Sequence, residues 1–192
     1  MKYRLVIFDM DGTLTEELLD FAAIRRDMGL PGPGGILEQL ALMEAQQRAR
    51  AEAILDRHER AASERCGAHD GAAELLRGLR QRGVKTALLT RNSAANARRI
   101  LGRNCLQLDH VAAREDLPHK PHPDSILNIT GRFGIERGET LMVGDYLYDL
   151  QAAQAAGVDS ALLHMKGGEL PEFAGMATYV VRSLGELKDI LE

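Results

Sequence analysis

The chain has 192 residues, 45% of them apolar, and a formal net charge of −4, which suits one α/β domain with a small second module. No basic stripe indicates a nucleic-acid partner, no apolar run is long enough to span a bilayer, and the first residues are typical of a strand rather than a cleavable signal segment. Cys66 and Cys105 are isolated and lack metal-ligand spacing, so we expect free thiols and a cytoplasmic location. The sequence gives no sign of an obligate protein partner.

The first predicted strand covers residues 3–9 and ends in two carboxylates. Its centre, Val6 to Phe8, is apolar without interruption, as in a strand buried on both faces of a parallel sheet. Asp9 and Asp11 follow at the carboxyl end, where open α/β sheets bind ligands, and Gly12 lets the backbone turn away. Two anions about 4 Å apart repel by roughly 4 kcal/mol near a protein surface, which a hard divalent cation would offset. Taken alone, the pattern fits a simple polar strand end equally well.

Residues 16–68 interrupt the alternation of strands and helices. A short helical stripe at 18–24 is followed by a connector rich in glycine and proline at 29–35. Residues 36–65 contain neither glycine nor proline and are rich in strong helix formers. We therefore predict one long helix there, or two with a bend near Gln46 to Ala49, whose many Glu and Arg side chains form a solvated face.

The second predicted strand of the sheet, residues 84–90, ends in a hydroxyl. Thr90 is followed by Arg91 and Asn92, and then by a predicted helix at 93–102 with Asn92 or Ser93 as its N-cap. A hydroxyl beside the free backbone N–H groups of a helix N-terminus predicts an anion site.

Lys120 stands in a stiffened segment before a predicted helix at 123–134. Pro121 holds the backbone extended on one side of it, and Pro123 suits the first turn of the helix. Lysine is scarce in this chain, with five residues among 24 basic ones. As a compact point charge it suits one phosphoryl oxygen or a bridging carboxylate.

A further buried strand is predicted at 139–145 and ends in Gly144 and Asp145. Asp149 then falls in the first turn of a predicted helix at 147–156, where it serves the same pocket or is a plain helix-end charge. The remaining predicted elements are strands at 108–113, 159–165 and 178–182 and helices at 70–82 and 183–191. Right-handed crossovers then require an α/β fold with a three-layer, doubly wound parallel sheet.

The motifs, in this order, resemble the haloacid dehalogenase-like hydrolase superfamily, in particular its phosphoglycolate phosphatase and β-phosphoglucomutase-like branch. The resemblance implies a Rossmann-like core at 1–15 and 69–192, a small helical cap at 16–68, and a central first strand between the Thr90 and Asp145 strands. The matching segments are Asp9-Met10-Asp11-Gly12-Thr13-Leu14-Thr15, Thr90, Lys120-Pro121 and Gly144-Asp145-x-x-x-Asp149.

The resemblance also implies a Mg²⁺-dependent phosphatase that hydrolyses a small-molecule phosphate monoester. Asp9 would be the nucleophile that forms an aspartyl-phosphate, and Asp11 the general acid and base. Asp9, Asp145 and the main-chain carbonyl of Asp11 would hold Mg²⁺, while Thr90 and Lys120 would stabilise phosphoryl charge. The implied phosphate-binding residues are Gly12, Thr90, Arg91, Asn92 and Lys120, and the supporting residues are Thr13, Gly144 and Asp149.

Several alternative activities can be weighed against these residues. Asp11 favours an oxygen leaving group, because halide leaves without a proton, and residues 16–68 contain no lysine for a Schiff-base phosphonate cleavage. A phosphomutase of the same superfamily stays open, because it differs only in keeping water off the aspartyl-phosphate. The alternative from another class is a receiver-like phospho-Asp signalling or binding domain. Receivers, however, carry adjacent acidic residues on the first strand and have no such cap.

Selectivity is expected to come from the cap, since a phosphoryl site of this kind is generic. Arg25 and Arg26 close the short helix, and we hypothesise that one of them contacts an anionic group of the substrate; alternatively, both are solvated helix-end arginines. Tyr146 and Tyr148 stand where the family commonly has small residues. These tyrosines either narrow the crevice and contact the cap or form a surface pair.

Overall fold

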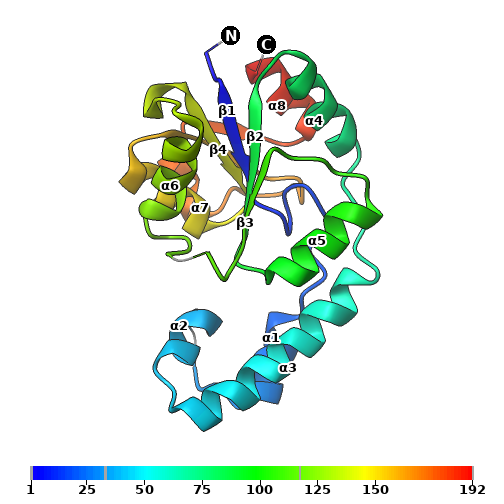
Figure 1. The fold of residues 1–192 in the computed structure, drawn as a ribbon, viewed down its shortest axis with the longest axis vertical. Helices are drawn as coiled ribbons and strands as arrows, with labels where there is room; N and C mark the ends of the chain where they lie inside the picture. The colour runs from blue at the N-terminus through cyan, green and yellow to red at the C-terminus, as the bar shows by residue number, and fades with distance from the viewer. Residues whose placement is uncertain (1, 33, 117, 192) are drawn as a thin grey trace.

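The computed structural model describes residues 2–32, 34–116 and 118–191, so Pro33 of the predicted connector lies outside the described residues. Within them, one parallel sheet has the strand order β3-β2-β1-β4-β5-β6 (Figure 1). The predicted central position of the first strand is therefore confirmed. The strands are β1 (Leu5–Phe8), β2 (Lys85–Leu89), β3 (His110–Ala112), β4 (Thr140–Gly144), β5 (Asp159–Leu163) and β6 (Tyr179–Val181).

The strand register brings the predicted motifs to one edge of the sheet. Phe8, the last residue of β1, pairs with Leu88 of β2 and with Val143 of β4. The next residue, Asp9, still donates its backbone N–H to the carbonyl of Val143 at 2.8 Å. The carboxyl ends of β1, β2 and β4 are therefore level, which is what allows residues far apart in sequence to share a site.

Helices cover both faces of the sheet and give the expected three layers. Side chains of β1 alternate between the two faces: Val6 and Phe8 join one apolar cluster, and Leu5 and Ile7 join the other. The first cluster includes residues of α4 (Ala72–Gln81), α5 (Ala94–Arg103) and α8 (Leu184–Ile190), and the second includes residues of α6 (Asp124–Phe133) and α7 (Leu147–Ala156). Short 3₁₀ helices are η1 (Arg137–Glu139) and η2 (Glu172–Met176).

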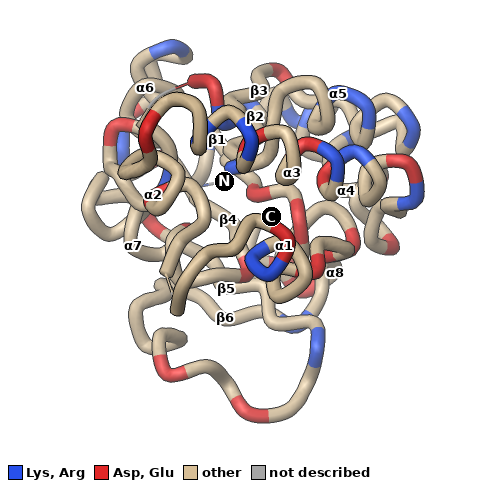
Figure 2. The backbone as a smooth tube through the Cα atoms, turned by 90° about the horizontal axis from the view of Figure 1, so that it is seen from below, with Lys and Arg blue, Asp and Glu red and all other residues tan. Residues whose placement is uncertain are grey.

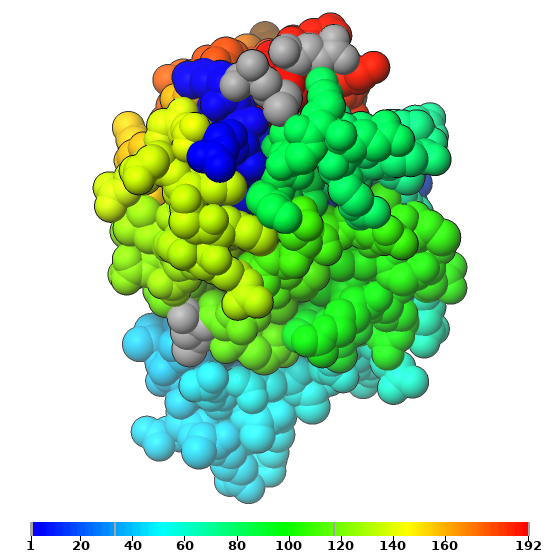
Figure 3. Space-filling view, turned by 45° about the horizontal axis from the view of Figure 1, so that its top comes forward, coloured from blue at the N-terminus to red at the C-terminus, as the bar shows by residue number. Residues whose placement is uncertain are grey.

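The segment between β1 and α4 forms a helical lobe at the carboxyl edge of the sheet. It contains α1 (Phe21–Met28), α2 (Ile36–Ala41) and α3 (Ala45–Ser63), which lie below the core in Figures 1 and 3. The lobe has its own apolar cluster, made of Ile24, Leu40, Ala51, Leu55 and partly buried neighbours. We call residues 16–68 the cap and the rest of the chain the core.

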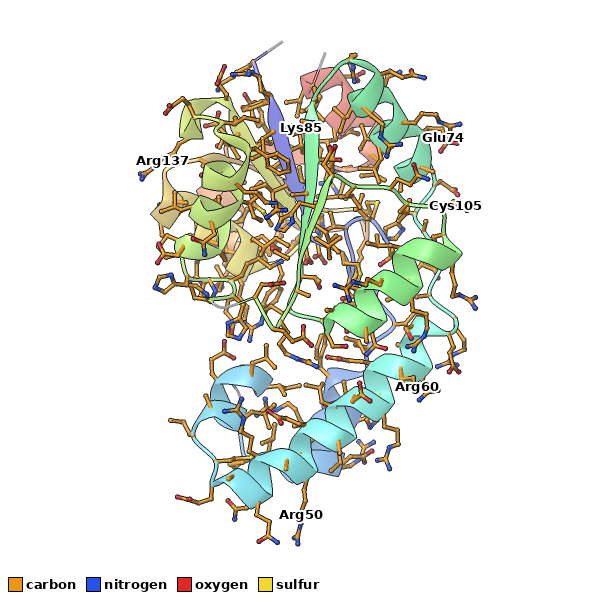
Figure 4. All side chains as sticks on the ribbon, in the orientation of Figure 1. Arg50, Arg60, Glu74, Lys85, Cys105 and Arg137 are labelled. Atoms are coloured by element: carbon orange, nitrogen blue, oxygen red, sulfur yellow. The ribbon has the colours of Figure 1, made fainter. Side chains whose placement is uncertain are left out.

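The predicted run at 36–65 consists of two helices, and the break falls earlier than the bend we placed near Gln46. Helix α2 ends at Ala41 and α3 begins at Ala45, after Glu44 adopts an extended conformation. On either side of the break, Leu40 of α2 and Leu55 of α3 belong to the same apolar cluster as Ile24 of α1. The outward-facing Arg50 and Arg60 of α3, labelled in Figure 4, belong to the expected solvated face.

The charged residues are mixed over the surface, as expected from a sequence without a basic stripe. Seen from the cap side, acidic and basic positions are interspersed over the helices (Figure 2). No helix among the described residues has the length and apolarity needed to cross a membrane. Cys66 is buried and Cys105 exposed, and both are free thiols, as expected.

Candidate active site

A cavity of about 500 Å³ lies between the cap and the carboxyl edge of the sheet. The core contributes the strand-end residues Asp9, Thr90 and Asp145, together with Asp11 and Lys120. Lys120 comes from the segment between β3 and α6, and its peptide bond to Pro121 is cis. The side chains that the sequence singled out on four separate segments therefore line one space.

Lys120 is the buried cation of this site, with only 3% of its surface exposed. Its Nζ atom lies 2.6 Å from Oδ1 of Asp9 and 2.5 Å from Oδ1 of Asp149. Burial disfavours the ammonium charge, but Asp149 and Asp9 outweigh it and raise the pKa of Lys120 above its ordinary value. Lys120 is thus a fixed positive charge beside Asp9.

Asp149 lies at the start of α7 and is fully buried. Burial raises its pKa to about 6, against the opposing effect of Lys120. Its second oxygen accepts a hydrogen bond from the backbone N–H of Tyr146 at 3.1 Å. Gly144 makes this position possible, because a Cβ there would lie 2.2 Å from Cγ of Asp149. Asp149 therefore holds Lys120 in place.

Three carboxylates supply oxygen atoms at a spacing that suits a metal ion. Asp9, Asp145 and Asp149 each have an oxygen within 4.8 Å of the other two. Asp149 forms an ion pair with Lys120, whereas Asp145 accepts a long hydrogen bond from the Thr13 hydroxyl, at 3.5 Å. Burial and then the charge of Asp9 raise the pKa of Asp145 to about 8. An acidic, oxygen-only set with one under-compensated carboxylate fits a hard divalent cation held by Asp9 and Asp145.

Gly12 allows this close approach of carboxylates. Its φ of +83° lies in the left-handed region, and a Cβ at this position would lie 2.2 Å from Oδ2 of Asp145. Any larger residue would therefore displace Asp145 as well as strain the turn. The glycine that follows Asp11 is thus needed for the geometry of the carboxylates, beyond its role in turning the chain.

Asp11 lies beside the loop that follows β2. Burial and then Asp9 raise the pKa of Asp11 to about 7. Asn92 approaches Asp11 with its side-chain amide at 3.5 Å and donates its backbone N–H to the Thr90 hydroxyl at 3.1 Å. Of the two predicted N-caps of α5, Ser93 is the one observed, since its hydroxyl accepts from the N–H of Asn96. Thr90 and Asn92 thus both lie at the cavity, as the sequence predicted.

Arg91 contacts the cap. Its guanidinium donates to both carboxylate oxygens of Glu38 on α2, at 2.7 and 2.8 Å, and to the main-chain carbonyl of Lys120 at 3.2 Å. It also lies 4.6 Å above the ring of Tyr148. Arg91 lines the cavity but its donors face these partners, so its assignment to phosphate binding stays a prediction.

A second ion pair joins the cap to the core, and the sequence analysis missed both of its members. Arg114, just beyond β3, donates to Glu59 of α3 at 2.6 and 3.2 Å. Both residues line the cavity, and Glu59 is 3% exposed. Arg114 follows the end of a parallel strand, as Thr90 does, and this position in the sequence could have identified it as a candidate site residue. Glu59 sits in a Glu/Arg-rich helix where nothing in the pattern distinguishes it.

The two arginines expected to contact substrate differ in their positions. Arg25 lines the cavity, but its guanidinium donates to the carbonyls of Pro31, Gly32 and Gly34 in the connector. Arg26 is exposed and is not among the residues that line the cavity. The structure therefore does not bring Arg26 to the site, and it gives Arg25 a bracing role in the cap.

Comparison with known proteins agrees with these features. The model of the haloacid dehalogenase-like hydrolase family matches residues 3–157. The chain is 30% identical to a haloacid dehalogenase-like hydrolase domain-containing protein of Arabidopsis thaliana, over 100% of this chain and 84% of the relative. It is 29% identical to a phosphoglycolate phosphatase of Aliivibrio fischeri, over 83% of each chain. A solved hydrolase structure from Pseudomonas syringae has the same fold, with a TM-score of 0.82 at 23% identity over 99% of both chains.

Proposed function

Since the chain belongs to the haloacid dehalogenase-like hydrolases, we propose that it is a Mg²⁺-dependent phosphatase, acting on a small phosphate monoester through an aspartyl-phosphate at Asp9. The observation that carries the proposal is the arrangement of Asp9, Asp11, Lys120 and Asp145 around one cavity. A nucleophile, an acid/base, a fixed cation and a metal ligand are the parts that this reaction needs. Membership of a hydrolase family argues against the receiver-like alternative.

In the first half-reaction, a carboxylate oxygen of Asp9 attacks phosphorus, and the bond from phosphorus to the ester oxygen breaks. Asp11 gives its proton to the departing oxygen, which leaves as an alcohol. Lys120, 2.6 Å from Asp9, is placed to stabilise negative charge on the transferring phosphoryl group. Thr90 and the N–H groups at the start of α5 lie at the same end of the sheet and add donors to that charge.

In the second half-reaction, water attacks the phosphorus of the aspartyl-phosphate. Asp11, now a carboxylate, takes the proton of that water, and the bond between Asp9 and phosphorus breaks to release inorganic phosphate. Mg²⁺ held by Asp9, Asp145 and the Asp11 carbonyl would supply positive charge that offsets the phosphoryl and carboxylate anions. Asp149 acts through Lys120, whose position it sets.

The experiment that tests the proposal detects the covalent enzyme. Acid-quenched wild-type protein, incubated with p-nitrophenyl phosphate and Mg²⁺, should carry phosphate on the peptide that contains Asp9. Asp9→Asn should release no phosphate and show no label while keeping a native circular dichroism spectrum. Label on another residue would contradict the assignment. Transfer of phosphate within a sugar phosphate, without release of inorganic phosphate, would identify a mutase instead.

A further inference from the structure

The cap half of the cavity presents a group of apolar side chains beside the charged residues Glu17, Arg25 and Glu59. The apolar side chains that α1, α2, α3 and the preceding segment place there are Leu19, Phe21, Ile36, Leu37 and Leu55. They face the leaving-group side of a substrate whose phosphoryl group sits at the strand ends. A volume of about 500 Å³ is within the range of pockets that hold whole small molecules, not only a phosphoryl group.

The three arginines that line the cavity already have hydrogen-bond partners. Arg25 donates to connector carbonyls, Arg91 to Glu38, and Arg114 to Glu59. A carboxylate on the substrate would have either to share an arginine whose charge is already compensated by these partners or to displace one of them. For Arg114 that displacement would leave Glu59 as a buried anion without its cation, which is costly.

The overall charge of the lining also opposes a second anion on the substrate. Among the described lining residues, six are acidic and four are basic, a formal charge of −2. With Asp11 protonated, as the first half-reaction requires, this charge becomes −1, and one divalent cation at Asp9 and Asp145 would leave a single positive charge for the phosphate itself. Any further negative group on the leaving group would therefore be repelled.

Tyr146 adds an aromatic surface at the mouth of the cavity. Its side chain lines the cavity yet the residue is 55% exposed. Its ring meets Tyr148 at 5.3 Å and Phe173 at 6.1 Å between centroids, both in edge-to-face geometry. Tyr148 is itself held beneath the guanidinium of Arg91. Tyr146 is thus oriented by its neighbours while much of it stays open to solvent, the arrangement of a preformed stacking surface.

From these observations we propose that the substrate is a phosphate monoester whose leaving group is uncharged and has an apolar ring face, packed between the ring of Tyr146 and the cap side chains around Phe21. This inference rests on the phosphatase function proposed above and specifies its substrate class. It assigns Tyr146 and Phe21 as specificity residues and gives Arg25 no role in substrate charge recognition.

A set of four primary phosphate esters separates the effect of a ring in the leaving group from the effect of a negative charge on it. The leaving group of ethyl phosphate is small and uncharged, and that of phosphoglycolate is small and carries a carboxylate. The leaving group of benzyl phosphate is an uncharged ring, and that of 4-carboxybenzyl phosphate is a ring with a carboxylate. We expect kcat/KM for benzyl phosphate to exceed that for ethyl phosphate by at least tenfold, and each carboxylate to lower kcat/KM by at least tenfold. Equal rates with and without the ring, or a preference for either carboxylate, would overturn the inference.

Variants assign the effect to the named side chains. Tyr146→Ala and Phe21→Ala should each lower the ratio of kcat/KM for benzyl phosphate to that for ethyl phosphate at least fivefold, while Tyr146→Phe should retain this ratio. Leu42→Ala is the matched control, because Leu42 is an exposed apolar cap residue that does not line the cavity. A loss of the ring preference in Leu42→Ala, or its survival in both alanine variants, would contradict the assignment.

A binding measurement separates this inference from the proposed function. Thermal shifts with 2-phenylethylphosphonate and 3-phosphonopropionate, which mimic benzyl phosphate and phosphoglycolate, do not depend on turnover. Stabilisation by the first and not by the second would support the ring site even if no ester were hydrolysed, an outcome that would contradict the phosphatase proposal alone. Stronger stabilisation by 3-phosphonopropionate would overturn the ring site whatever the activity.

Discussion

The ammonium group of Lys120 lies 2.5 Å from the carboxylate of Asp149, and both residues are almost completely withdrawn from solvent. Neither group would be stable in this place alone, because an unpaired buried charge is strongly destabilising. The pair therefore explains how a lysine can be kept charged and immobile next to Asp9. It also makes the position of Lys120 depend on a residue that does not touch the reacting phosphorus.

Breaking this pair should reduce stability. We expect Asp149→Ala to lower the free energy of unfolding by about 3–5 kcal/mol, since it removes one of the two carboxylates that pair with the buried Lys120 among the described residues. Urea denaturation measures the loss. The double variant Lys120→Met/Asp149→Ala should lose less than the sum of the two single variants. Strictly additive losses would mean that the two groups do not stabilise each other.

Mg²⁺ should stabilise the wild type much more than Asp145→Asn. Without metal, the variant should be the more stable protein, because it removes a buried carboxylate that faces Asp9. With Mg²⁺ at about 100 times its dissociation constant, the wild type should gain about 2.7 kcal/mol, and the variant far less. Thermal unfolding with EDTA and with Mg²⁺ checks this, with Glu52→Gln on the outer face of α3 as a control. Equal gains in both proteins would remove Asp145 from the metal site.

Asp11→Asn should lower turnover of alkyl phosphates by about two to four orders of magnitude, the usual contribution of a positioned acid/base. The loss should be clearly smaller for p-nitrophenyl phosphate, because its leaving group hardly needs a proton. Steady-state kinetics on benzyl and p-nitrophenyl phosphate make the comparison. The same loss on both esters would indicate that Asp11 acts on the metal or on the fold.

The Glu59–Arg114 pair should respond unequally to removal of its members. Arg114→Ala leaves a carboxylate that is 3% exposed without its cation, and should cost about 3–5 kcal/mol. Glu59→Gln should cost less, because the Arg114 side chain is 22% exposed and can be hydrated. Urea denaturation of the two variants tests the order, and a larger loss in Glu59→Gln would refute the argument.

Asp109 should make stability depend on pH in the acid range. Burial opposes its charge, but hydrogen bonds from the backbone N–H and hydroxyl of Thr86, with Lys85 and Arg80 nearby, lower its pKa below the ordinary 3.8. A carboxyl with a lowered folded-state pKa stabilises the fold above its unfolded pKa and loses that effect as pH falls through the folded one. Asp109→Asn should therefore be less stable than wild type at pH 6, and the difference should shrink below pH 3.8. A constant difference between pH 6 and pH 2.5 would contradict this.

The core and the strand-end part of the site could be predicted from sequence because local pattern is enough for both. Uninterrupted apolar runs identify parallel strands, and parallel strands necessarily present their carboxyl ends at one edge. Asp9, Thr90 and Asp145 each follow such a run, so their convergence required no knowledge of side-chain contacts. The predicted bounds of the core elements differ from the observed ones by at most two residues.

The cap contacts were decided only by the tertiary structure. Arg91 meets Glu38 and Arg114 meets Glu59, pairs separated by 53 and 55 residues, and their partners lie in a lobe whose placement over the core no local pattern encodes. The sequence does not distinguish Glu59 from the other Glu residues of α3, because only the packing of the lobe on the core buries it. The same holds for Arg25. Its charge suggested a ligand site, but in the structure its guanidinium donates to a carbonyl of the connector. Short-range periodicity thus determined the strands and the catalytic edge of the sheet, whereas the packing of the cap on the core determined which charged side chains are buried together.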